Sequence, residues 1–301
     1  MIDKKTNSYY IAALSAFVIW GMFSFALKPL KGYQSMDILF YRVFFAAMIL
    51  IVYSFFFNKN KMKANYQKFI ALPKNEKLST IKLTLFGGAL LTANWFVFIF
   101  VINQISIKSA AYAYLVCPIL TTLFAFIIIK EKLLKHQWFA VAISISSIVI
   151  LAIYNFNDLM FSMIVAVSYA LYLVSQRKNT NIDKLPILMF QMIFSAILLL
   201  PFYPYYSGPT PTQEVFYVLI LVIAIVFTIV PLLLNLYAIE GLPSSTVGIL
   251  LYINPILNFI VAVVYFNEKT YWYQWLSYTL VGVSILVFNK HILFNRKQEI
   301  I

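Results

Sequence analysis

Long apolar stretches recur along the whole chain and are separated by short polar segments. A transmembrane helix needs about 20 apolar residues to cross a bilayer, and the stretches lack the short alternation of an outer-membrane barrel. We therefore expect an all-α integral membrane protein with ten transmembrane helices. The expected spans are residues 8–28, 36–57, 82–103, 108–129, 136–154, 159–176, 185–203, 214–239, 244–267 and 272–293.

Two of the polar boundaries add detail to this prediction. The first apolar run ends near Lys28-Pro29 and is too long for the core of a cleavable signal peptide, so we interpret it as a retained span. The loop at residues 58–81 is longer than the others and rich in lysine. Its pattern predicts a surface helix around Ala64–Leu72, before Pro73.

Two segments of the chain are alike when one is shifted by 137 residues. Residues 118–138 and 255–275 share 8 of 21 residues without a gap, including a proline, a Glu-Lys pair and a Gln-Trp pair. This pattern indicates a duplication into two five-helix repeats, residues 1–155 and 156–301. Because five is odd, the repeats enter the membrane from opposite sides. Inverted repeats are typical of carriers, although duplicated channels also exist.

The basic residues orient these spans. If the N-terminus lies in the cytoplasm, 18 of the 23 Lys and Arg residues fall in cytoplasmic segments and 4 in outer loops, while Arg42 lies within a span. Cytoplasmic loops are enriched in Lys and Arg. We therefore expect both termini on the cytoplasmic side, with Lys132 facing the cytoplasm and its counterpart Lys269 facing outward.

Composition supports the membrane interpretation and excludes other classes. Hydrophobic residues make up 62% of the chain and charged residues 11%, whereas a soluble domain carries about 25% charged residues. The net charge of +13 does not indicate a nucleic-acid partner, because no soluble basic domain is present to hold a duplex. The single cysteine, Cys117, permits no disulfide within one chain and no metal site.

The sequence also lacks the motifs of an enzyme. It contains no glycine-rich phosphate loop, no histidine–carboxylate cluster and no nucleophile triad, so we expect no catalytic residues, no cofactor and no metal. No Asp or Glu lies near the middle of a span, where ion-coupled carriers often place one. This weighs against a carboxylate relay and leaves facilitated diffusion, exchange or another form of coupling.

A series of short motifs, in order along nearly the whole chain, resembles the drug/metabolite transporter superfamily. The chain resembles its EamA-type group, and within that group the RarD permeases most. The resemblance implies two inverted repeats around a central cavity lined mainly by spans 1, 3, 4, 6, 8 and 9, with spans 5 and 10 more peripheral. One departure concerns a glycine that usually precedes the Glu-Lys pair, since Lys130 and Asn267 stand in its place. The motifs are Trp20-Gly21, Tyr41-Arg42-Val43, Asn94-Trp95, Tyr114, Pro118, Glu131-Lys132, Gln137-Trp138, Val230-Pro231-Leu232, Tyr252, Pro255 and Glu268-Lys269.

Arg42 is the only clearly intramembrane charge, and charges at that depth are costly and usually functional or paired. It is either an anchor for a substrate carboxylate or a structural tie to backbone carbonyls or Asp37. The other candidates for the cavity are amides and aromatic residues within spans, which provide amide, phenol and indole groups; each aromatic also has ordinary packing as its alternative role. They are Trp20, Asn94, Trp95, Tyr114, Tyr169, Asn235, Tyr252 and Asn254.

Three prolines interrupt expected spans. Pro118 and Pro255 occupy equivalent positions in the two repeats, and Pro231 lies in span 8. Proline removes a backbone donor and blocks the carbonyl four residues before it, and interrupted segments at matching places in two halves indicate the centre of a carrier. We interpret all three as hinges, and a remnant of the duplication is the alternative for the matched pair.

Together these patterns predict a secondary transporter, a permease for small organic molecules that are neutral, zwitterionic or anionic. It would work by alternating access in the cytoplasmic (inner) membrane of a bacterium, with the lipid bilayer and its substrate as partners. A passive channel-like conduit and a non-transporting receptor or assembly protein are the alternatives. A homodimer is an arrangement that the sequence leaves open.

Overall fold

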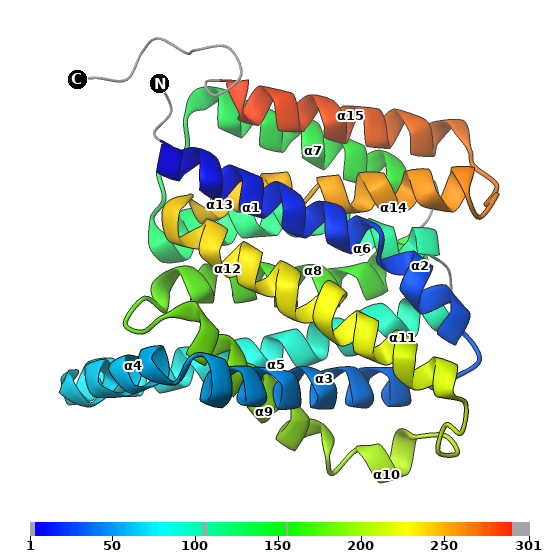
Figure 1. Ribbon diagram of the computed structural model, residues 1–301. Helices are drawn as coiled ribbons and strands as arrows, with labels where there is room; N and C mark the ends of the chain where they lie inside the picture. The colour runs from blue at the N-terminus through cyan, green and yellow to red at the C-terminus, as the bar shows by residue number, and fades with distance from the viewer. Residues whose placement is uncertain (1–3, 105–106, 155, 291–301) are drawn as a thin grey trace.

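The computed structural model describes residues 4–104, 107–154 and 156–290, and all regular structure within these ranges is helical. The helices form a bundle in which most axes run along one common direction (Figure 1). Its first part comprises α1 (Lys4–Gly21), α2 (Phe23–Leu27), the 3-10 turn η1 (Lys28–Leu30), α3 (Ser35–Val52), the π segment η2 (Tyr53–Phe57), α4 (Lys59–Ala71), α5 (Lys74–Gln104), α6 (Ile107–Phe124), the π segment η3 (Ala125–Ile129) and α7 (Lys135–Tyr154). Its second part comprises α8 (Phe156–Lys178), α9 (Lys184–Leu199), α10 (Tyr203–Tyr206), α11 (Glu214–Ala224), the π segment η4 (Ile225–Ile229), α12 (Val230–Gly241), α13 (Ser244–Leu250), α14 (Ile253–Val264) and α15 (Trp272–Phe288).

Several expected spans consist of consecutive helical pieces. Span 1 comprises α1, α2 and η1, span 8 comprises α11, η4 and α12, and span 9 comprises α13 and α14. Spans 2 and 4 end in the π segments η2 and η3. Such π segments insert extra residues into a helix and often mark functional sites. The sequence predicted interruptions at the prolines of spans 4, 8 and 9, but not the breaks in spans 1 and 2.

The apolar helices confirm a helical membrane fold. Six helical stretches of the described residues are long and apolar enough to cross a bilayer, and three shorter apolar helices accompany them. These coincide with expected spans, and α8 covers the one that remains. The count of ten crossings stays a prediction. The six long stretches are Lys5–Leu30, Ser35–Phe57, Lys74–Val101, Lys135–Tyr154, Glu214–Gly241 and Ser244–Val264.

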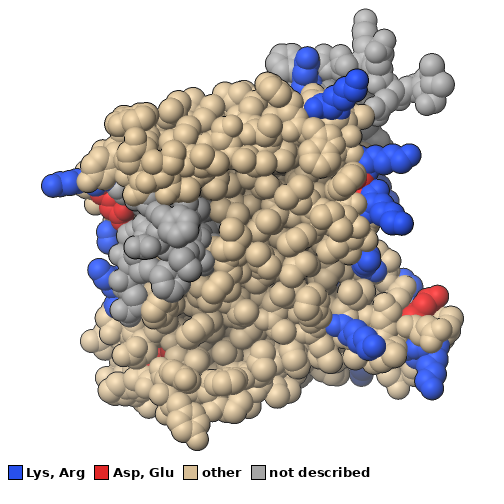
Figure 2. All heavy atoms as spheres, turned by 180° about the vertical axis from the view of Figure 1, so that it is seen from behind, with Lys and Arg blue, Asp and Glu red and all other residues tan. Residues whose placement is uncertain are grey.

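The surface of the bundle has an uncharged band between two charged ends. Figure 2 shows Lys and Arg side chains at both ends of the molecule, with a broad tan surface between them. Many large apolar side chains of the helices are exposed, as expected where lipid replaces water. They include Phe44, Met48, Ile197, Val218 and Leu286.

The lysine-rich segment forms two helices rather than a long loop. The predicted surface helix is α4, which ends at Ala71 because Leu72 is extended, with ψ at 147°. A following proline favours this conformation. After Pro73, α5 begins at Lys74, earlier than the expected start at residue 82. Pro73 thus separates two consecutive helices.

Helices of the two halves pack closely against one another. The most extensive contacts join α6 to α8, α7 to α15, α5 to α8 and α1 to α12. Serines contribute two hydrogen bonds to the α7–α15 contact: Ser144 donates to Ser284 at 3.0 Å, and Ser147 donates to the Ser277 carbonyl at 2.9 Å. Small residues of this kind let membrane helices approach each other. The α7–α15 pair lies at one side of the bundle (Figure 1), which agrees with the peripheral place expected for spans 5 and 10.

The duplicated segments adopt the same backbone turn. Lys130 (φ 61°) and Asn267 (φ 52°) are the non-glycine residues with positive φ among those described, and they are 137 positions apart. One residue later, the Glu131 N–H donates to the Ala125 carbonyl at 3.1 Å, and the equivalent Glu268 N–H donates to Ala262 at 3.0 Å. The left-handed cap usually provided by glycine is therefore present at both places without glycine.

Candidate functional site

Aromatic and polar side chains from both halves of the chain meet around a small cavity. Six of the nine residues expected at a cavity line it, and Phe23 and Phe98 join them. The room inside is about 20 Å³, enough for about one water molecule. The six are Trp20 of α1, Arg42 of α3, Trp95 of α5, Tyr114 of α6, Tyr169 of α8 and Asn254 of α14.

Arg42 is the eighth residue of α3, at the start of its third turn, and has only 2% of its surface exposed. Its Nε donates to Thr228 Oγ1 at 2.7 Å and its Nη2 to the Phe227 carbonyl at 3.3 Å. The guanidinium also lies over the rings of Trp95, at 4.5 Å from the centroid, and Phe23, at 5.1 Å. Such cation–π contacts stabilise a desolvated cation.

Asp37 does not pair with Arg42. Its Oδ2 accepts a hydrogen bond from the Gly208 N–H at 3.0 Å instead. Within the described part of the chain, no carboxylate lies within ion-pair distance of the Arg42 guanidinium. The structural tie proposed from sequence therefore runs to a backbone carbonyl and a threonine, and not to Asp37.

Pro231 accounts for the availability of the Phe227 carbonyl. In an α-helix this carbonyl would accept a hydrogen bond from the N–H of residue 231, which proline lacks. The preceding residues form the π segment η4, and Thr228 turns its hydroxyl to the Ile223 carbonyl at 2.9 Å. The Phe227 carbonyl is bonded by the Trp20 indole at 3.0 Å as well as by Arg42.

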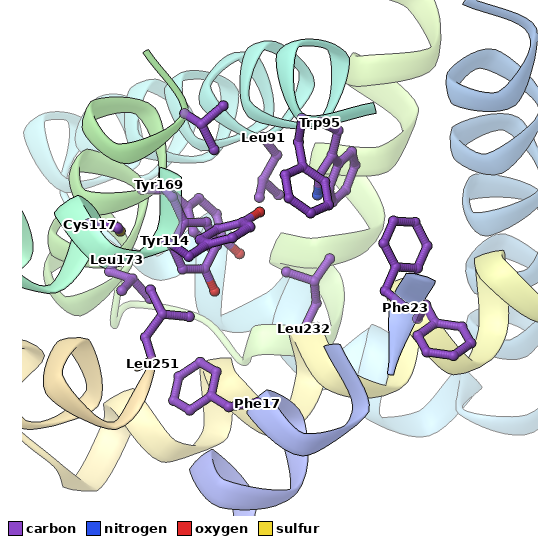
Figure 3. Close-up of a cluster of buried hydrophobic side chains, with 14 of the residues drawn as sticks. Phe17, Phe23, Leu91, Trp95, Tyr114, Cys117, Tyr169, Leu173, Leu232 and Leu251 are labelled. Carbon is purple, nitrogen blue, oxygen red and sulfur yellow. The ribbon is translucent and has the colours of Figure 1, made fainter. Parts of the chain in front are cut away.

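Two amides that do not line the cavity form hydrogen bonds with the hydroxyls of its tyrosines. Asn94 Nδ2 donates to the Val165 carbonyl at 2.8 Å, and its Oδ1 accepts from the Tyr114 hydroxyl at 3.3 Å. Asn235 Nδ2 donates to the Tyr169 hydroxyl at 3.0 Å. Figure 3 shows Tyr114 and Tyr169 next to each other in this cluster, and their rings are 6.1 Å apart in an edge-on arrangement. Asn94 and Asn235 thus support the cavity without lining it.

Asn254 reaches the cavity from a broken span. Its Oδ1 accepts from Asn258 Nδ2 at 2.5 Å, and Asn258 Oδ1 accepts from Ser24 at 2.8 Å. This chain of polar groups links α14 to α2. Tyr252, two residues earlier, is fully buried and does not line the cavity, and its hydroxyl has no hydrogen-bond partner among the described residues.

The three prolines interrupt their helices to different extents. Pro118 lies inside the unbroken helix α6. Pro255 follows a break, because α13 ends at Leu250 and α14 begins at Ile253. Pro231 lies in the first turn of α12, directly after a π segment. The two matched prolines therefore differ in local backbone.

Glu131 caps the first residues of α13. Its carboxylate accepts from the Ser244 N–H at 2.7 Å, the Ser245 N–H at 3.0 Å and the Ser245 hydroxyl at 2.8 Å. A carboxylate at a helix N-terminus satisfies donors that the helix leaves unpaired. Glu131 thus has a structural role here, since it joins the first half to the start of α13 in the second.

Sequence reasoning missed several members of this site. Phe23, Phe98 and Thr228 carry no signal that separates them from other residues of their spans. The Phe227 carbonyl could have been found, because it lies four residues before Pro231. No group of three His, Cys, Asp or Glu residues that could hold a metal occurs among the residues searched, which are those the structure describes.

The profile of the EamA-like transporter family matches the chain twice, at residues 7–153 and 158–290. The chain belongs to this family. It is therefore a multi-pass membrane protein with the fold of a transporter family, and such a protein implies a small-molecule substrate and a lipid bilayer as its surroundings. The second match shows that each half of the chain resembles the family separately.

Curated bacterial relatives match nearly the whole chain, and some of them are named as transporters. The chain is 26% identical over 291 residues to the uncharacterized transporter YojE of Bacillus subtilis, covering 96% of this chain and 95% of that one. It is 25% identical over 307 residues to the protein RarD of Escherichia coli, covering 99% of each. A solved crystal structure that is 14% identical has a TM-score of 0.70 and covers 97% of this chain and 99% of its own, which supports the fold alone.

Proposed function

We propose that this EamA-family protein is a secondary transporter that carries small organic molecules through the central cavity by alternating access. The observation behind the proposal is the convergence of side chains from α1, α3, α5, α6, α8 and α14 on one cavity between the halves. An enzymatic role is not part of the proposal, because the cavity holds no nucleophile–base pair. The cavity's own residues would bind and orient the substrate, and no cofactor is needed.

The two halves would act as oppositely inserted repeats, residues 1–155 and 156–301. The two family matches, at 7–153 and 158–290, support this division. The repeated turn at Lys130 and Asn267 supports it as well. Glu131 contacts the start of α13 at one end of the bundle, whereas the α14–α15 turn lies at the other end (Figure 1). Two opposed halves can exchange inward-open and outward-open shapes around a fixed site.

The small volume of the cavity fits a closed state of such a cycle. A cavity of about 20 Å³ is far below the volume of about 300 Å³ or more that small-molecule pockets provide. A substrate would therefore enter only when the halves separate. The backbone break before Pro255 and the π segment before Pro231 are places where this movement can occur, whereas Pro118, inside an unbroken helix, would act by bending α6.

The membrane in question would be the bacterial cytoplasmic membrane, with both termini in the cytoplasm. The bacterial relatives and the distribution of Lys and Arg support this orientation. A homodimer is compatible with the proposal but is not required by it, since the cavity is formed within one chain.

Counterflow with purified protein tests this function. Metabolite profiling of cells with and without the protein supplies candidate compounds, and proteoliposomes then measure their flux. A carrier exchanges labelled for unlabelled substrate faster when substrate is present on both sides. Flux without this stimulation would indicate a channel, and binding without flux a receptor; either result would contradict the proposal.

A further inference from the structure

The Arg42 guanidinium has more donors than partners. Arginine carries five N–H donors, and only Nε and one N–H of Nη2 have acceptors, Thr228 and the Phe227 carbonyl. The remaining donors meet no acceptor among the described residues. Only 2% of the surface of Arg42 is exposed, and the side chain lines the cavity.

Three other residues of the cavity also have hydrogen-bond donors without a described acceptor. The Tyr169 hydroxyl accepts from Asn235 but donates to no described residue. The Asn254 NH₂ group and the Trp95 indole N–H also donate to no described residue, although both residues line the cavity. The Phe227 carbonyl and the oxygens of Asn94 and Asn254 already receive hydrogen bonds, whereas Asn235 Oδ1, behind Tyr169, has no partner among the described residues. Arg42, Asn254 and Trp95 therefore offer unused N–H donors to the cavity.

A buried cation without an anion is costly. Removing an ion from water costs several kcal/mol or more unless a partner of opposite charge compensates it. Two neutral acceptors and two aromatic faces compensate Arg42 only in part. A ligand that brings a negative charge would supply what this arrangement lacks, and a bidentate carboxylate matches the guanidinium fork.

The side chains that line the cavity indicate the chemistry of the part of the ligand that does not contact Arg42. Phe23 and Trp95 present rings to the guanidinium, and Trp20 and Phe98 add two more rings to the cavity lining. They suit an apolar or aromatic body, whose negative group would point to Arg42. No carboxylate of the described residues lies in the cavity to hold a cationic group.

We propose that the substrates are small organic anions, with an apolar or aromatic body, whose carboxylate binds Arg42 in the central cavity. This inference rests on the proposed transport function, because it names the substrate class of the same site. It narrows the earlier set of neutral, zwitterionic and anionic molecules to those that carry a negative group.

Matched acids and amides test it on the wild-type protein. Benzoate is compared with benzamide, and indole-3-acetate with indole-3-acetamide, because each pair has nearly one shape and differs in charge. Binding of the benzoate pair is read from tryptophan fluorescence, since Trp20 and Trp95 line the cavity. Binding of both pairs is read from the rise in the midpoint of thermal unfolding, since a ligand of the native state stabilises it. We expect at least one acid to bind about tenfold or more tightly than its amide, a difference of about 1.4 kcal/mol.

Substitutions then assign the preference to Arg42. Arg42→Gln should abolish the difference between acid and amide, and Arg42→Lys should retain part of it, because lysine keeps the charge and loses the fork. Arg177→Gln is the matched control. Arg177 also donates to backbone carbonyls at the end of α12, those of Ile239 and Glu240, but lies outside the cavity, so the preference should persist there.

The outcomes separate this inference from the transport proposal. Equal binding of acids and amides to the wild-type protein, or no binding of any acid, overturns the inference, even if Arg42→Gln fails to fold. If the amides show counterflow at the same rate as the acids, the transport proposal is retained and the inference of anionic substrates is overturned. Acid binding that depends on Arg42 but produces no counterflow would retain the anion site and refute transport.

Discussion

Pro231 lies four residues after Phe227, and the Phe227 carbonyl accepts hydrogen bonds from two side chains of the first half, Trp20 and Arg42. A proline in the second half thus frees the acceptor that holds the central arginine of the first half. The link crosses the interface between the halves at the cavity itself. Movement of one half relative to the other would therefore change the surroundings of Arg42 directly.

Replacing Pro231 with alanine should reduce transport without reducing stability. The restored N–H can bond the Phe227 carbonyl within the helix, which competes with Trp20 and Arg42. We expect an unchanged or higher midpoint of thermal unfolding in detergent, and a loss of flux of about fivefold or more, corresponding to about 1 kcal/mol. Pro186→Ala in the first turn of α9 is the control and should leave flux unchanged. Normal flux in Pro231→Ala would refute the proposed role.

Replacing Trp20 with phenylalanine should destabilise the protein modestly. The change keeps an aromatic ring and removes the indole donor to the Phe227 carbonyl. Interhelical hydrogen bonds in membranes contribute about 0.6 kcal/mol on average, so we expect a loss of that order. Trp95→Phe is the comparison, because the Trp95 indole donates to no described residue. Thermal unfolding measures the loss of stability in both variants. Equal losses would show that the hydrogen bond from Trp20 contributes little.

Glycine at position 130 should stabilise the protein. A left-handed conformation costs a residue with a β-carbon about 1 to 2 kcal/mol, but glycine and, in part, asparagine adopt it readily. Lys130→Gly should therefore raise the free energy of unfolding by up to about 1 kcal/mol, and Asn267→Gly should raise it less. A larger gain at Asn267 than at Lys130 would contradict this explanation of the repeated turn.

Removing the charge of Glu131 should weaken the contact between the halves. Glu131→Gln leaves one acceptor where the carboxylate now serves two N–H groups and a hydroxyl. Loss of a helix cap costs about 0.5 to 2 kcal/mol, and we expect a decrease within that range. Glu240→Gln, an exposed acid at the end of α12, should have little effect. Similar values for both variants would exclude a capping role.

The length and position of the apolar runs in the sequence determined much of what could be predicted about the fold. The positions of the apolar helices, the surface helix before Pro73 and the family itself follow from runs and motifs that are local in the sequence. The interruptions were harder to predict. A π segment such as η4 depends on how neighbouring helices bond the backbone, as Trp20 and Arg42 do at Phe227, and no local pattern marks it.

The site residues show the same limit. Asn94 and Asn254 are both amides within apolar spans, yet Asn94 ties α5 to α8 while Asn254 lines the cavity. Tyr114 and Tyr252 are likewise similar in sequence and differ in place. Which role each takes depends on partners distant in the sequence, so composition identified the candidates but not their arrangement.

Cysteine accessibility at the two repeated Glu-Lys pairs tests the central claim, that the halves are inserted in opposite directions. Lys132→Cys and Lys269→Cys are made with Cys117→Ala, which removes the buried native thiol. A membrane-impermeant maleimide should label position 269 in intact cells and position 132 only in inside-out vesicles. Labelling of both positions from the same side would contradict the inverted arrangement and the alternating-access mechanism built on it.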